Sequence, residues 1–104
     1  MMIQQFSVKA TKDYGVNASI LLTNIYQLIE HNQANDIDYH DGYYWISSSL
    51  KSFSQFFPFL TQRQIEVALK KLEKEGLIIT GNYNETPFDR TKWYAISKKG
   101  LMAL

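Results

Sequence analysis

The sequence predicts an α+β domain in which three helices form the core and a small β-hairpin follows them. Three observations predict this fold. Residues 61–76 carry a cap signal at each end of a helical pattern, and residues 18–31 repeat apolar side chains at helical spacing. Asp41-Gly42 lies between two aromatic-rich runs, as expected of a two-residue hairpin turn. With 104 residues, 45% of them apolar, the chain can bury the core of a single domain.

The helix predicted over residues 61–76 is the best-defined element. Thr61 and Gln64 fit a capping box, in which each side chain satisfies a free amide at the helix start. Gly76 suits the left-handed residue that ends many helices. One face carries an apolar stripe formed by Ile65, Ala68, Leu69 and Leu72.

The opposite face of this helix is basic and has one aliphatic residue in its middle. It is formed by Arg63, Val67, Lys70 and Lys74. A face of this kind suits a helix that enters the major groove of DNA, which is wide enough to admit it. The alternative is that the charges only keep an outer helix face solvated, as in most soluble domains.

The chain is predicted to divide into an N-terminal arm over residues 1–13 and a domain over residues 14–104. Phe6, Val8 and Ala10 alternate with polar residues, which favours a short strand or an extended arm. Such an arm either packs on its own domain or pairs with a second copy. Asn17 is predicted to cap the helix over 18–31. Ile20 falls on the polar side of that helix, where we expect it to be exposed or to contact a partner.

The remaining elements follow from turn and stop signals. Residues 37–46 are predicted to form the hairpin, and residues 49–56 a short helix that begins at serines and ends before Pro58. Residues 77–80 and 91–97 are predicted strands, and residues 81–91 form the loop between them. A short terminal helix is predicted after Ser97, and it is weak because it contains Gly100. This order predicts a winged helix-turn-helix with the core Leu22, Ile25, Phe53, Ile65, Leu69, Leu72, Ile79, Trp93 or Tyr94, and Ile96.

Several segments together resemble a known family. They are Tyr14 to Ile20, Gly42 to Ile46, Phe57 to Thr61, Ile65 to Leu77, Gly81 to Asn84 and Asp89 to Tyr94. In this order they resemble the N-terminal winged-helix domain of phage and plasmid replication initiators of Gram-positive bacteria, the replisome-organiser or DnaD-like group. The resemblance implies binding of origin or single-stranded DNA and assembly at the start of replication. Longer members add a linker and a second helical domain, so the chain is expected to be a fragment or a short phage protein.

Composition indicates the kind of partner and the compartment of the protein. Residues 1–60 carry more acids than bases and residues 61–104 more bases than acids, so the overall charge of +1 hides a basic C-terminal half. The absence of cysteine suits a reducing cytoplasm. No apolar run is long enough for a membrane span and no secretion signal is present, so we expect a cytoplasmic protein without membrane contact.

No motif indicates catalysis. The cluster Asp36, Asp38, His40 and Asp41 fails the spacing of a calcium loop, and no glycine-rich phosphate loop is present. Serines 47–49 have no nearby histidine to activate them. We therefore expect neither enzymatic activity nor a metal or cofactor.

The predicted DNA contacts come from the helix and the loop. Those on the helix are Gln62, Arg63, Glu66, Val67, Lys70 and Lys74, and those on the loop are Tyr83, Asn84, Arg90 and Lys92. The lysine and arginine side chains would contact phosphates or the edges of nucleobases. Val67 would contact a thymine methyl group, and Glu66 would accept from a cytosine amino group. Because the net charge is small, we expect a homodimer or a higher oligomer.

Two alternatives remain open from the sequence. In the first, Ile20, Val67, the aromatic residues 39–46 and the arm form a protein-interaction surface for self-association or for other replication proteins. In the second, the domain is a phage-type transcriptional regulator, since the same fold serves that role.

Overall fold

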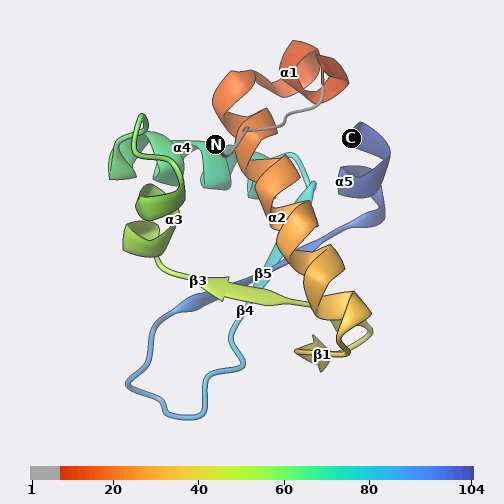
Figure 1. Ribbon diagram of the computed structural model, residues 1–104, viewed down its shortest axis with the longest axis vertical. Helices are drawn as coiled ribbons and strands as arrows, with labels where there is room; N and C mark the ends of the chain where they lie inside the picture. The colour runs from red at the N-terminus through yellow and green to blue at the C-terminus, as the bar shows by residue number, and fades with distance from the viewer. Residues whose placement is uncertain (1–7) are drawn as a thin grey trace.

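The computed structural model describes residues 8–104, whose elements wrap a three-helix core with a small sheet along one side (Figure 1). In chain order these are α1 Val8–Tyr14, α2 Val16–Ala34, β1 Tyr39–His40, β2 Tyr43–Tyr44, β3 Ile46–Ser48, α3 Leu50–Phe56, α4 Gln62–Lys74, β4 Ile78–Gly81, β5 Lys92–Ile96 and α5 Lys98–Ala103. The winged helix-turn-helix prediction is confirmed: α3 and α4 form the helix-turn-helix, and β4, β5 and the loop between them form the wing.

The core lies where α2, α3, α4 and the sheet meet. Every helix residue predicted for it is buried: Leu22, Ile25, Phe53, Ile65, Leu69 and Leu72. From the wing, Tyr94 is buried while Trp93 is only half-buried, because Tyr94 faces the helices and meets the Phe53 ring edge-on at 5.7 Å. Ile96 is also buried, and Ile79 is half-buried on the other face of its strand.

The predicted local signals form as expected. The Thr61 hydroxyl accepts from the Gln64 amide at 3.0 Å, and the Gln64 side chain accepts from the Thr61 amide at 2.9 Å, which completes the capping box. Gly76 has a φ of 76°, the left-handed conformation that ends α4. Asp41 and Gly42 both have positive φ, so the turn between β1 and β2 is the predicted two-residue turn.

The weak terminal helix is present as α5, and Gly100 is the reason it can pack. The Ser97 side chain accepts from the Gly100 amide at 3.0 Å and caps the helix. A Cβ at position 100 would lie only 2.2 Å from the carbonyl oxygen of Leu77. The glycine that weakens α5 as an isolated helix is therefore required by its close approach to the start of the wing.

The sheet departs from the sequence prediction in one respect. The predicted strand over 43–46 is split, because Trp45 interrupts the pairing and Ile46 begins β3. Strand β3 then pairs antiparallel with β5 through Ile46–Tyr94, Ser47–Trp93 and Ser48–Lys92, giving a three-stranded sheet of order β3-β5-β4. This pairing places the start of α3 beside the wing.

Three N-terminal predictions are wrong. Residues 8–10 belong to the helix α1 and not to a strand or extended arm, while Phe6 lies outside the described residues. Helix α2 begins at Val16, with Gly15 at its N-cap position and no side-chain cap, so Asn17 is inside the helix. Ile20 is 5% exposed, because α2 packs against α1 as well as α4 and β5 and is covered on more than one side.

Candidate nucleic-acid interface

The outer face of α4 is open to solvent. The side chains of Arg63 and Lys70 are 81% and 72% exposed, and Val67 is 51% exposed between them. Gln62 and Lys74 are exposed at the two ends of the helix. The helical period predicted a face of basic side chains around one aliphatic residue, and this face is accessible along the length of α4.

Glu66 lies between Arg63 and Lys70 on this face. Its carboxylate is 3.7 Å from the Arg63 guanidinium and 3.5 Å from the Lys70 ammonium, one turn apart on the same helix. Exposed pairs of this kind contribute only about 0–1 kcal/mol to stability. Their larger consequence is electrostatic, since Glu66 lowers the positive potential that an approaching anion meets on this face.

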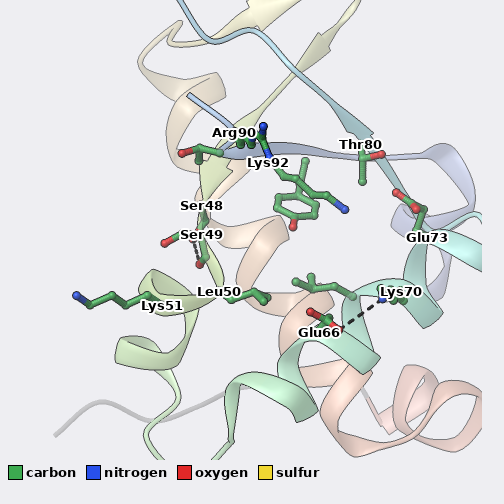
Figure 2. Close-up of a pocket in the computed structure, with 13 residues that line it drawn as sticks. Ser48, Ser49, Leu50, Lys51, Glu66, Lys70, Glu73, Thr80, Arg90 and Lys92 are labelled. Atoms are coloured by element: carbon green, nitrogen blue, oxygen red, sulfur yellow. Dashed lines mark hydrogen bonds and ion pairs between the residues drawn. The ribbon is translucent and has the colours of Figure 1, made fainter. Parts of the chain in front are cut away.

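A groove of about 580 Å³ runs between α4 and the wing, and we call it the α4–wing groove. Figure 2 shows Glu66, Lys70 and Glu73 on the side of α4, with Arg90, Lys92 and Thr80 on the opposite side and Ser48 to Lys51 at one end. Its lining contains four basic and two acidic residues, so its net charge is positive. The basic residues are Lys51, Lys70, Arg90 and Lys92.

The lining of the groove includes apolar side chains and a phenol. Leu50, Leu69 and Tyr94 contribute to it, and no hydrogen bond ties the Tyr94 hydroxyl to another group within residues 8–104. Burial, and after it the negative charge of Glu73, raises the pKa of Tyr94 to about 12. The phenol therefore keeps its proton near neutral pH.

Two of the predicted wing contacts are engaged within the protein. The Tyr83 hydroxyl donates to Asp41, which raises the pKa of Tyr83, and its ring stacks on His40 with the centroids 4.4 Å apart. The Asn84 side chain donates to the carbonyl oxygens of Asp89 and Thr91 and accepts from the Trp93 indole at 2.7 Å. These residues hold the wing together and joined to the β1–β2 hairpin, so their polar groups are not free for a ligand.

The other two predicted wing residues have different surroundings from Tyr83 and Asn84. Arg90 and Lys92 are both exposed, and both line the α4–wing groove with Lys70. Lys51 and Tyr94 also line the groove, a position that the sequence did not predict for either of them. Their place depends on the pairing of β3 with β5, which brings the start of α3 to the wing and has no local sequence signal.

A second hollow of about 480 Å³ lies on the other side of α4. It is formed by the junction of α1 and α2, from Tyr14 to Ala18, together with Arg63, Gln64, Val67, Ala68 and Lys71. Val16 and Val67 are both about half exposed beside it. Arg63 and Val67 therefore lie on the rim between this hollow and the open face of α4.

Residues 8–104 contain no group of three or more acidic or histidine side chains placed to hold a metal ion. In the same part of the chain, no helix has both the length and the apolar character needed to cross a membrane.

Comparison with solved structures supports the fold. A structure described as the N-terminal domain of a DNA binding protein matches with a TM-score of 0.68 and 14% sequence identity, over 93% of this chain and 75% of that one. At this level of identity the likeness is one of fold. No protein-family model and no curated protein matches the sequence.

Proposed function

We propose that this domain binds DNA, with the outer face of α4 in the major groove and a phosphate strand along the α4–wing groove. The observation that carries the proposal is the convergence of Lys70 from α4 with Arg90 and Lys92 from the wing on one open, positively charged groove. The solved structure of similar fold belongs to a DNA-binding protein, which supports the same assignment.

The chemistry of the surface fits this ligand. Lysine and arginine side chains neutralise phosphates and release counterions, which provides most of the affinity of a DNA-binding protein. Gln62 at the start of α4 and Val67 in its middle are of types that contact base edges and thymine methyl groups.

The finer part of the proposal is a role in the initiation of replication. It rests on the resemblance of six sequence segments to replication initiators, and it includes self-association, because a chain with a net charge of +1 binds DNA weakly as a single copy. The test compares the affinity for origin fragments of the encoding genome with that for promoter fragments of equal length. Equal or stronger binding to the promoters would favour a transcriptional regulator.

Glu66→Gln provides a test of the docking geometry. The substitution removes the negative charge between Arg63 and Lys70, so we expect the affinity for duplex DNA to rise by roughly 3- to 10-fold at about 0.1 M salt. Fluorescence anisotropy with a labelled duplex over a salt series measures this. The affinity should also depend more steeply on salt, because Arg63 and Lys70, released from Glu66, neutralise phosphates more fully.

Glu75→Gln is the matched control, since it removes the same charge from an exposed residue at the end of α4 that does not line the groove. It should change the affinity by less than about twofold, because Glu75 does not line the groove and salt screens exposed charges. Equal effects of the two variants would mean that α4 does not present its outer face to DNA.

A further inference from the structure

The loop of the wing displays an aromatic side chain to solvent. Phe88 is 90% exposed, the most of any large apolar side chain in residues 8–104. Single exposed apolar residues are common on protein surfaces and carry no meaning by themselves. Phe88 differs in its setting, because hydrogen bonds link the loop residues around it and two basic residues of the groove, Arg90 and Lys92, lie two and four positions after it.

Hydrogen bonds hold the loop in shape on both sides of Phe88. The Asp89 amide donates to the Thr86 carbonyl at 3.3 Å, which closes a turn over Pro87 and Phe88. The Asp89 carboxylate accepts from the Thr91 amide at 3.0 Å, and this hydrogen bond lowers the pKa of Asp89. Asn84, earlier in the same loop, donates to the carbonyl oxygens of Asp89 and Thr91. The loop backbone that carries Phe88 is therefore held by hydrogen bonds, which reduces the entropy that the loop would lose on binding.

The charges next to Phe88 point to nucleic acid. Arg90 and Lys92 follow at the second and fourth positions and line the groove in which we place a phosphate strand. Of the acids in the loop, Asp89 is committed to the Thr91 amide, and Glu85 is exposed and does not line the groove. A phosphate strand held by Arg90 and Lys92 would bring the attached bases within reach of the same loop.

We propose that Phe88 stacks on a nucleobase of the DNA bound in the α4–wing groove, and that this contact favours DNA with unpaired bases. The inference rests on the proposed DNA binding. Stacking of a base on an aromatic side chain is tolerant of sequence, because every base has a π-face. Insertion into an intact duplex requires a base step to be unstacked at a cost similar to the gain, whereas an unpaired base incurs little such cost. The stacking contribution should therefore appear mainly with unpaired DNA.

The test is Phe88→Ala, with Phe88→Trp as the variant that retains a stacking surface. Anisotropy titrations use a labelled duplex with a central mismatched bubble and the same duplex fully paired. Phe88→Ala should lower the affinity for the bubble duplex by roughly 5- to 150-fold and that for the paired duplex by less than about threefold. Phe88→Trp should keep the wild-type preference. Because Phe88 is exposed, neither substitution should change the melting temperature, which is measured alongside.

The outcomes separate the two proposals. Unchanged affinity of Phe88→Ala for the bubble duplex, or an equal loss on both duplexes, would overturn the stacking proposal while DNA binding stands. Failure of the wild-type protein to bind either duplex would overturn both. Unchanged DNA binding together with a loss of self-association in Phe88→Ala, seen by light scattering, would assign Phe88 to a protein contact.

Discussion

Reversing two bases of the α4–wing groove, Lys70→Glu together with Lys92→Glu, is expected to lower the affinity for duplex DNA by about 100-fold at about 0.1 M salt. Each phosphate contact contributes about 0.9 to the slope of log affinity against log salt, so losing two contacts lowers affinity by roughly 60-fold at this concentration. Repulsion between the new carboxylates and the phosphates adds to the loss. Both positions are exposed, so the fold should tolerate the change.

Lys12→Glu with Lys98→Glu is the matched control for the reversal. It makes the same change in net charge at two exposed lysines, on α1 and α5, that do not line the groove. The control should lose less than about fivefold in affinity in the same anisotropy titration, since neither lysine lines the groove and salt screens exposed charges. Similar losses in the two double variants would show that binding depends on net charge alone and not on the groove.

The largest effect on stability is expected from Phe53→Ala. Phe53 is fully buried between the helices and packs edge-on against Tyr94, so it connects α3 to the central strand of the sheet. Removing its ring leaves a cavity, and we expect the free energy of unfolding to fall by about 3–5 kcal/mol. Since small domains have about 5–15 kcal/mol in total, urea denaturation should show a large shift of the midpoint.

Phe56→Ala provides the comparison, because Phe56 belongs to the same helix but is 42% exposed. Phe56→Ala should lower the free energy of unfolding by less than half as much as Phe53→Ala, because less of the Phe56 side chain is removed from water on folding. A cost for Phe56→Ala equal to that for Phe53→Ala would contradict the packing of α3 described above.

The parts of the fold that could be predicted are those with local causes. The capping box at Thr61 and Gln64 and the turn at Asp41-Gly42 each depend on residues a few positions apart, and both formed as predicted. The pairing of β3 with β5 joins residues about 45 positions apart, and nothing near Ile46 indicates its partner. Ile20 was expected to be exposed or to contact a partner because residues 8–10 were predicted as a strand or arm, whereas they belong to α1, a helix that packs against α2.

The candidate site divides along the same line. Arg63, Val67 and Lys70 share a face because of the helical period alone, so the sequence could place them together. Residue type could not show that the polar groups of Tyr83 and Asn84 are used within the protein, because their partners lie on other segments. The same limit applies to Tyr94, which was predicted for the core and also lines the groove through the pairing of β3 with β5.

The claim that the α4–wing groove and the outer face of α4 form one DNA-binding surface is tested most directly by backbone amide NMR spectra during a titration with duplex DNA. The largest shifts should fall on Arg63, Val67, Lys70 and residues 90–92, with small shifts on α5 and on the β1–β2 hairpin. Shifts concentrated on α5 or on that hairpin, with α4 unchanged, would contradict the proposed interface.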